Sequence, residues 1–458
     1  MRRRGSRYLA VVVISAIFLV GCGQASDGSV KARPGPTTSD ESSPSRPSVG
    51  RGPVAPATPR PPSGPGILHG RVVDRSGYPI AALSLLVVGH SLTATDAEGT
   101  FAVPEVTPPY DVALLDDSTG VATIYTQLTR MDPQLTNLTD RFGDPGESRS
   151  AELTGSIDGG VPLQQRWTQM GLAWASPGVV GGDFIAQTPY AFPFYWNGPS
   201  TITGTLHALQ WMADGDLVTG YLGYATRTGV TVQSGGSVGN IDFGLVPPEV
   251  TTISGTVLAP SGFILFGRTF DLTFDDGASF LLGGDSGDTM PDATFSVPVP
   301  AGIGATCLVT ARALEVIDYD RSVYRFTQVK QAGVLPGRSD LTLELPFPAL
   351  PVHPVDGETL DATAELGWTA LPDAVYQVRV GAETTGARSY ILVSGSTHAR
   401  VPELPQHWGL QQGGHYVWYV TALGPYPRGI DEFAGREARP ADSRFLTWSN
   451  DSHFVARP

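Results

Sequence analysis

Glycine and proline restrict most strongly what this chain can fold into. The sequence holds 55 glycines and 39 prolines among 458 residues, well above average usage. Both destabilise the interior of an α-helix, glycine through backbone entropy and proline through its missing N–H. No long segment has apolar residues spaced three and four apart, and the best helical candidate, 407–412, lies between Pro405 and Gly413. We therefore expect an all-β protein of short strands and turns.

Short segments with roughly alternating polarity recur, with turn residues about every ten positions, as in β-sandwiches. Leu68–Asp74, Thr252–Val257 and Tyr376–Val380 are examples. The roughly 390 residues after the N-terminal region are too many for one core and suit three or four domains. We expect a tandem array of Ig-like or transthyretin-like sandwiches. The boundaries expected for its four members are 67–147, 148–248, 249–347 and 348–458.

The N-terminal segment has the features of a signal peptide. Four arginines precede the apolar run Tyr8–Val20. About 13 residues at 1.5 Å each cover roughly 20 Å of helix, short of the ~30 Å hydrocarbon core of a membrane. We therefore expect a signal peptide over residues 1–21 rather than a spanning helix. The alternatives are an ordinary secretory signal with a chance cysteine, or a short signal anchor.

The run Leu19-Val20-Gly21-Cys22 places a small residue directly before a cysteine. It resembles the lipobox of bacterial lipoproteins, which implies lipid attachment at Cys22. Two or three acyl chains hold a protein on a membrane durably. The resemblance implies a lipoprotein of the bacterial cell envelope that faces outside the cytoplasm, in the periplasm or on the cell surface.

Residues 22–66 are rich in Pro, Ser, Gly and Thr and contain almost no large apolar residue. Such a segment cannot bury enough surface to offset the entropy of ordering. After the lipidated Cys22 we expect a disordered linker that tethers the folded part above the membrane.

Charge and cysteine content exclude several classes of function. The formal net charge of −14 argues against nucleic acid as a partner and against polybasic membrane contact. Lys31 and Lys330 are the only lysines, which makes lysine chemistry improbable. Cys307 is the only cysteine besides Cys22 and lies in an apolar run, so we expect a buried, inert thiol.

Residues 67–145 carry a specific pattern. Gly70–Ile80 reads G-x-V-x-D-x-x-G-x-P-I, Thr95–Phe101 reads T-D-x-x-G-x-F, and Tyr110–Val112 follows. The pattern resembles the carboxypeptidase regulatory-like, or transthyretin-like, domain, whose fold is similar to carbohydrate-binding-like modules. We expect Asp74 and Asp96 to be turn residues rather than catalytic acids.

The later segments carry weaker patterns. Leu153–Ile157 and Ile253–Val257 begin two stretches about 100 residues apart that look like a degenerate tandem pair, which suits a domain array. The last segment, with Trp368, Tyr376–Val380 and Tyr416–Ala422, resembles a fibronectin type III domain. That resemblance implies that Trp368 fills the core and Tyr416 supports a corner.

The search for chemistry finds no catalytic constellation. Gly284–Asp288 and Gly235–Gly239 match serine-nucleophile patterns only in part and are expected to be chance loops. The eight histidines show no metal-ligand spacing, and we expect no metal or cofactor. Calcium binding in acidic loops stays open, although solvated turn acids are favoured. The acids in question are Asp285, Asp288 and Asp292, and Asp214 and Asp216 with Asp318 and Asp320.

Aromatic residues are the remaining candidates for binding. Tyr190–Trp196 and Trp211 could stack on sugars if exposed, although aromatics at strand spacing are more often core. We expect a non-catalytic, membrane-anchored binding or scaffold array with an unknown protein or glycan ligand. The alternatives are a carbohydrate-binding surface protein and an accessory or hydrolytic enzyme with a site built across domains.

Overall fold

The computed structural model describes residues 65–161, 168–215, 217–286, 293–318, 323–361, 365–384, 386–435 and 443–457. Nearly every element is a β-strand, which confirms the expected all-β class. The helices among the described residues are α2 (Ile430–Phe433) and the 3-10 turn η1 (Gln406–Trp408), which replaces the longer helix considered for 407–412. The signal segment, Cys22 and nearly all of the linker lie outside the described residues.

The first repeat is a seven-strand sandwich of two sheets, ordered β4-β1-β7 and β3-β2-β5-β6. Its first strand pairs antiparallel with β4 and parallel with the last strand, β7. The strands are β1 (Gly66–Val73), β2 (Ser84–Val87), β3 (Thr93–Ala94), β4 (Thr100–Val106), β5 (Tyr110–Asp116), β6 (Val121–Leu128) and β7 (Gln134–Thr136).

The second and third repeats have the same strand order. Their sheets run β12-β8-β15 with β11-β10-β13-β14, and β20-β17-β23 with β19-β18-β21-β22. Strands β9 and β16 extend the second repeat as a separate parallel pair. The strands of the second repeat are β8 (Ser148–Gly155), β9 (Ile157–Gly159), β10 (Thr168–Ser176), β11 (Val179–Phe184), β12 (Tyr190–Asn197), β13 (Thr201–Asp214), β14 (Leu217–Gln233), β15 (Ser237–Val238) and β16 (Phe243–Leu245). Those of the third are β17 (Glu249–Leu258), β18 (Ile264–Phe274), β19 (Ser279–Ser286), β20 (Thr294–Ala301), β21 (Ala305–Asp318), β22 (Val323–Val334) and β23 (Leu341–Glu344).

Two glycines explain part of the sequence likeness between these repeats. A Cβ on Gly155 would lie 2.0 Å from the carbonyl oxygen of Ile241, and one on Gly255 would lie 2.1 Å from that of Leu341. Both glycines lie in the first part of their repeat, where the chain runs close beside the closing segment. Only glycine permits so close an approach of two backbones.

The C-terminal sandwich has a different order, with sheets β24-β26-β29 and β28-β27-β30 and with β31 and β32 both paired to β30. Trp368 is buried in its core, and the Tyr416 hydroxyl accepts a hydrogen bond from the backbone N–H of Gln411 at 2.9 Å, so both expected roles are confirmed. The strands are β24 (Pro351–His353), β25 (Glu358–Leu360), β26 (Leu366–Trp368), β27 (Val375–Ala382), β28 (Ser389–Ser394), β29 (His398–Ala399), β30 (His415–Gly424), β31 (Phe445–Trp448) and β32 (Ser452–Ala456).

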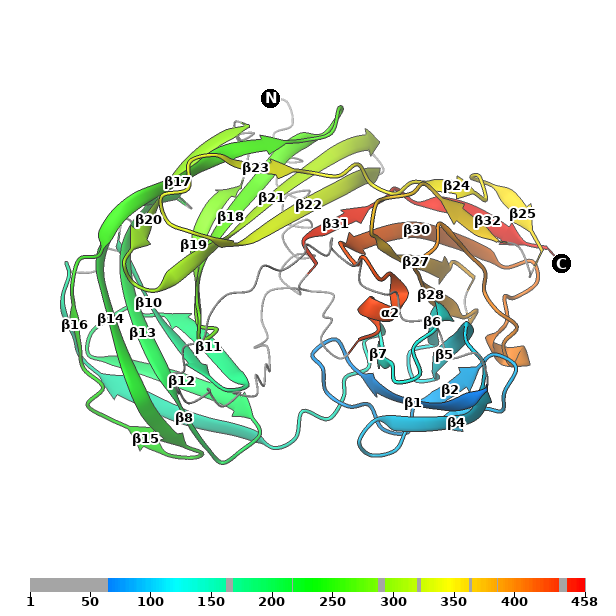
Figure 1. Cartoon of the computed structure of the whole chain (residues 1–458), viewed down its shortest axis with the longest axis horizontal. Helices are drawn as coiled ribbons and strands as arrows, with labels where there is room; N and C mark the ends of the chain where they lie inside the picture. Colours follow the sequence, from blue (N-terminus) through cyan, green and yellow to red (C-terminus); the bar gives the residue numbers. More distant parts are fainter. Residues whose placement is uncertain are drawn as a thin grey trace, which may run out of the picture.

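The repeats do not form a linear string, because the C-terminal sandwich joins two of them edge to edge. Strand β6 of the first repeat pairs parallel with β28, and β22 of the third repeat pairs antiparallel with β31. One continuous sheet therefore runs from β19 to β3 through three of the four segments. The chain closes into a ring in which the first repeat lies beside the C-terminal sandwich and the second repeat lies opposite (Figure 1).

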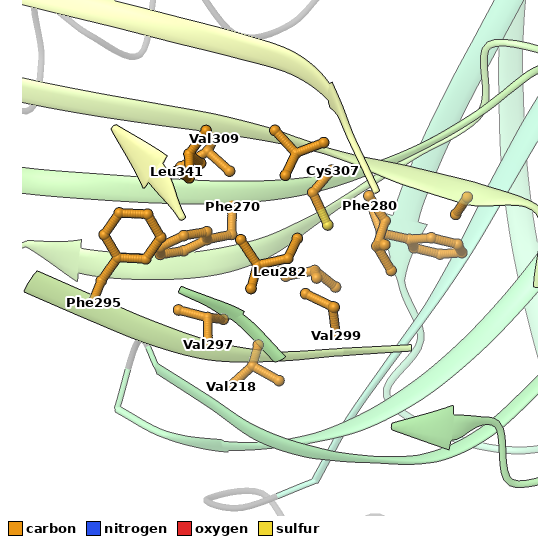
Figure 2. Packing of buried hydrophobic residues seen from close by; sticks show 14 of the residues in the cluster. Val218, Phe270, Phe280, Leu282, Phe295, Val297, Val299, Cys307, Val309 and Leu341 are labelled. Carbon is orange, nitrogen blue, oxygen red and sulfur yellow. The ribbon is translucent and has the colours of Figure 1, made fainter. Parts of the chain in front are cut away.

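Buried side chains also cross the boundaries between segments. Side chains of β13 alternate between a core within the second repeat, which includes Leu206, and a core shared with the third repeat, which includes Trp211. The shared core holds Cys307 among Phe270, Phe280 and Val309 (Figure 2). Cys307 is fully buried, as expected, and this burial raises the pKa of its thiol to about 12.

Candidate functional site

The aromatic run in β12 faces inward rather than forming a platform. Tyr190, Phe192, Phe194 and Trp196 are buried in the core of the second repeat, and Trp211 is 1% exposed. Tyr195, on the opposite face of the strand, is 70% exposed. The sugar-stacking platform considered for these residues is therefore wrong, since all but one of them are core.

The serine motifs and acidic loops gather no catalytic or metal set among the described residues. Ser237 lies in the short strand β15, which pairs with β8, so no helix follows it. Asp214 and Asp318 lie at the ends of different strands, β13 and β21. Among the described residues, no group of three or more His, Cys, Asp or Glu side chains could hold a metal ion. Four of the calcium candidates lie outside the described residues: Asp216, Asp288, Asp292 and Asp320.

The two acids of the first-repeat pattern are turn residues, as expected. Asp74 Oδ1 accepts hydrogen bonds from the backbone N–H groups of Ser76 and Tyr78 at 2.8 and 2.9 Å. Asp96 Oδ1 accepts from the N–H groups of Glu98 and Thr100 in the same way. These carboxylates fix turns that position β1 and β4.

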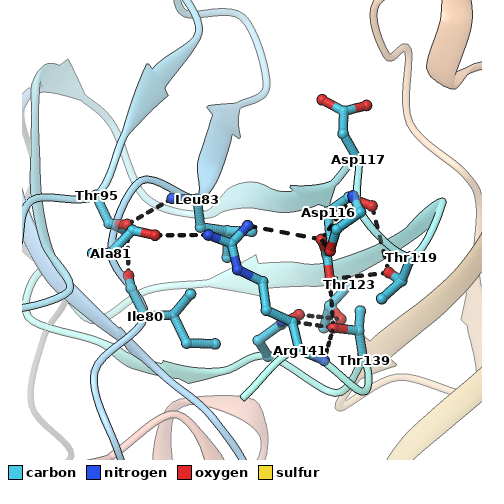
Figure 3. A network of polar contacts seen from close by, with 12 residues as sticks. Ile80, Ala81, Leu83, Thr95, Asp116, Asp117, Thr119, Thr123, Thr139 and Arg141 are labelled. Atoms are coloured by element: carbon cyan, nitrogen blue, oxygen red, sulfur yellow. Dashed lines mark hydrogen bonds and ion pairs between the residues drawn. The ribbon is translucent and has the colours of Figure 1, made fainter. Parts of the chain in front are cut away.

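A third carboxylate, Asp116, forms a buried polar network at the end of β5 (Figure 3). Its oxygens accept hydrogen bonds from the hydroxyls of Ser118, Thr119 and Thr139, at 2.5, 2.9 and 2.8 Å, and Arg141 lies 3.8 Å away. Burial alone would raise the pKa of Asp116, but the hydrogen bonds together outweigh burial and lower it. The network ties the segment after β7 to the β5–β6 turn.

Asp116→Asn is expected to lower the free energy of unfolding at pH 7 by about 1.5–3 kcal/mol, because it weakens hydrogen bonds to a buried charge. Since the pKa of Asp116 is lower in the folded state than its ordinary value, the carboxylate stabilises the fold above the unfolded-state pKa. That stability is lost as the pH falls through the folded-state pKa. Urea unfolding of both proteins at pH 7 and at about pH 3 should show the difference shrinking. Asp117→Asn, at an exposed ion pair, is the control and should cost less than about 1 kcal/mol. A pH-independent difference would contradict this role.

His207 joins the second repeat to the third. Its Nδ1 shares a hydrogen bond with the Tyr224 hydroxyl and its Nε2 with Asp276 Oδ2, both at 2.9 Å, and its ring stacks 4.2 Å from that of Phe274. Burial, with a smaller effect of Asp276, raises the pKa of Tyr224 to about 12. The phenol therefore stays protonated at neutral pH. The hydrogen bonds of His207 with Tyr224 and Asp276 hold the two repeats together, and Tyr224 is not an activated nucleophile.

The seam between the first repeat and the C-terminal sandwich carries further polar contacts. Helix α2 presents Asp431, whose Oδ1 accepts hydrogen bonds from the backbone N–H groups of Thr129 and Arg130 at 2.8 and 3.1 Å. Arg388 pairs with Asp117 at 3.2 Å while its guanidinium lies 4.3 Å from the Trp408 ring. These contacts join the first repeat to the C-terminal sandwich beside the β6–β28 pairing.

One surface next to the seams combines aromatic rings with unpaired positive charge. Tyr324 and Tyr419 lie with their ring centroids 5.7 and 5.5 Å from that of Trp448, and Arg379 is the cross-strand neighbour of Tyr419. Arg75, from the turn after β1, is close enough to Arg379 and Tyr419 for its charge to affect both. We call these five residues the seam face.

The seam face lies on one side of the continuous sheet. Side chains alternate along β30, so Tyr416 and Trp418 enter the core of the C-terminal sandwich while Tyr419 points to the opposite side. Tyr324, Arg379, Tyr419 and Trp448 are each half-buried. The sequence could not indicate this surface, because its residues come from three segments that only the β22–β31 and β6–β28 pairings bring together.

Sequence and structure comparisons give no family for this chain. No family model matches it, and no curated protein matches it in sequence. Solved structures with some likeness include the Bacillus anthracis TIE protein, at 9% identity and a TM-score of 0.14, with 61% of this chain and 50% of that chain covered. The FN1–FN3 domains of chicken CNTN1 have 9% identity and a TM-score of 0.18 over 87% and 100% of the two chains. The shaft pilin spaA from Lactobacillus rhamnosus GG has 9% identity and a TM-score of 0.14 over 44% and 99%.

The chain spans about half the length of the Bacillus anthracis TIE protein. Likeness at these TM-scores says nothing about what this chain binds or does. The β-sandwich repeats are instead established by the strand pairings described above. No helix among the described residues is both long and apolar enough to span a bilayer.

Proposed function

We propose that this protein is a non-catalytic scaffold that holds a binding surface outside the cytoplasm, anchored to a bacterial membrane through lipid on Cys22. The observation that carries the proposal is the continuous sheet through the first repeat, the C-terminal sandwich and the third repeat. Linear domain arrays bend at their linkers, whereas strand pairing between domains fixes their relative positions. A rigid ring suits presentation of a surface better than turnover of a substrate.

The anchor is tested by Cys22→Ser. We expect the variant to move from the membrane fraction to the soluble fraction of cells and to lose metabolic labelling by palmitate, because one thiol carries the lipid. Cys307→Ala is the matched control, since that thiol is buried and should leave labelling intact. Retention of the serine variant on membranes would contradict lipid anchoring.

Carbohydrate binding is the second candidate function, and the seam face favours it. Aromatic rings beside hydrogen-bonding side chains are the usual means by which proteins hold sugars, because the rings pack on the apolar faces of pyranosides. An enzyme with a site across domains remains the third reading. If the purified chain had a hydrolytic activity that a single substitution abolished, the enzyme would be supported and the scaffold proposal would be overturned.

A further inference from the structure

We infer that the seam face binds an acidic glycan, a chain of sugars that bears carboxylates at intervals, with Arg379 and Arg75 holding a carboxylate and the aromatic row holding the sugar rings. The inference rests on the proposed scaffold function and names the surface that the scaffold presents. Strands β22, β31, β30 and β27, which carry four of its five residues, lie side by side along one side of the ring (Figure 1).

Unpaired positive charge argues for an anionic ligand. The side chain of Arg379 has neither a hydrogen bond nor an ion pair within the described part of the chain, whereas Arg130, Arg325 and Arg388 each pair with a carboxylate. The guanidinium of Arg75 is part-buried, and its Nη2 donates one hydrogen bond, to the carbonyl of Leu138.

The two guanidiniums of the seam face also act on each other. Partial burial lowers the pKa of Arg75, and Arg379 lowers it further, with a larger effect than the opposing one of Asp140. Asp140 and Asp451 also act on this surface, but within the described part of the chain neither guanidinium forms an ion pair with a carboxylate, so both can still receive an anion.

The row Tyr419–Trp448–Tyr324 argues for sugar rings beside that anion. The ring centroids follow one another at 5.5 and 5.7 Å with interplanar angles of 42° and 71°, so the row presents ring faces and edges in turn across three strands.

Asp451 distinguishes an acidic glycan from a denser polyanion. Its carboxylate lies near Tyr324 and Tyr419 and contributes to raising the pKa of both phenols, after burial. A negative charge beside the row can accept a hydrogen bond from a sugar hydroxyl, but it repels a ligand with a phosphate at every unit, such as single-stranded nucleic acid. The face therefore suits a polymer in which carboxylates alternate with neutral hydroxyls.

The test measures binding of the purified chain to three probes: a partly methyl-esterified oligogalacturonate, its fully methyl-esterified form, and inorganic polyphosphate. We expect the partly esterified oligogalacturonate to bind at least about tenfold tighter than either of the others, because only it offers both sugar rings and widely spaced carboxylates. Arg379→Gln should weaken that binding about tenfold, and Tyr324→Ala about fivefold. Arg400→Gln and Tyr195→Ala, exposed residues outside the seam face, are the matched controls and should leave binding unchanged.

The outcomes separate this inference from the function on which it rests. If the fully methyl-esterified probe bound as tightly as the probe with carboxylates, the preference for an acidic glycan would be overturned, and carbohydrate binding itself would stand. Tight binding of polyphosphate that Tyr324→Ala leaves unchanged would mean a general anion site and would overturn the sugar part. Failure of all three probes would overturn the inference, whereas the membrane anchoring of the scaffold is decided separately by the Cys22→Ser fractionation.

Discussion

Ile124→Asp in β6 is expected to unfold the C-terminal sandwich together with the first repeat. Ile124 belongs to the first repeat in sequence, yet its side chain is fully buried in a core with Trp368, Tyr376 and Trp418 of the C-terminal sandwich. An unpaired carboxylate in that core costs about 5 kcal/mol or more, comparable to the whole stability of many domains. The effect crosses the boundary because β6 and β28 are strands of one sheet.

Hydrogen exchange read by mass spectrometry measures this coupling directly. Peptides from β27 and β30 should lose protection in Ile124→Asp although these strands lie roughly 250 to 300 residues further along the chain. Ile124→Ala gives the same test at a cost of about 2–5 kcal/mol. Ile67→Asp is the matched control, because Ile67 in β1 is 57% exposed and should change neither segment. Wild-type protection of β27 and β30 in the Ile124 variants would mean that the two segments fold independently.

Trp211→Ala is expected to destabilise the second and third repeats together. Trp211 is 1% exposed, and its ring contacts Phe184 of its own repeat and Phe280 of the third. Loss of a buried tryptophan costs about 3–5 kcal/mol, and the cavity would open in the core that the two repeats share. Differential scanning calorimetry should show the transition that contains both repeats moving to lower temperature.

Two further variants show whether the calorimetric effect of Trp211→Ala comes from the loss of its ring in the shared core. Trp211→Phe should cost much less, since it keeps an aromatic ring in place and removes an indole N–H that is buried without a hydrogen-bond partner. Met212→Ala, the next residue on the opposite face of β13 and 37% exposed, is the control for position. If Trp211→Ala shifted one transition and left a separate third-repeat transition unchanged, the shared core would not couple the repeats.

Local structure was predictable from the sequence where local physics decides it. Alternating polarity and abundant turn residues predict strands, and Asp74 and Asp96 are turn residues because a carboxylate caps the N–H groups two and four positions on. Burial of Cys307 followed from its apolar neighbours. The candidate at Tyr190–Trp196 showed the limit of this approach, because alternation alone could not say which face of β12 meets a core.

The ring closure and the seam face could not be predicted, for a physical reason. Strands β6 and β28 are far apart in the sequence and meet only in the folded protein. No local pattern in either strand indicates that its edge pairs with the other. The candidate site follows from that pairing: Arg75, Tyr324 and Tyr419 are unremarkable surface residues until the seams place them together. The boundaries expected for the four domains and lipid attachment at Cys22 stay predictions.

The parallel pairing of β6 with β28 has a consequence for the order in which the molecule is made. The hydrogen bond from the Thr126 hydroxyl to the carbonyl of Val393 joins residues 267 positions apart. Until the ribosome has synthesised the C-terminal sandwich, strand β6 of the first repeat has no partner on one side, so this edge stays open while almost the whole chain is made. Contacts of such long range form slowly and leave an edge open to wrong partners meanwhile. A chain of this kind gains from crossing a membrane in the unfolded state and folding only once it has been released complete on the far side.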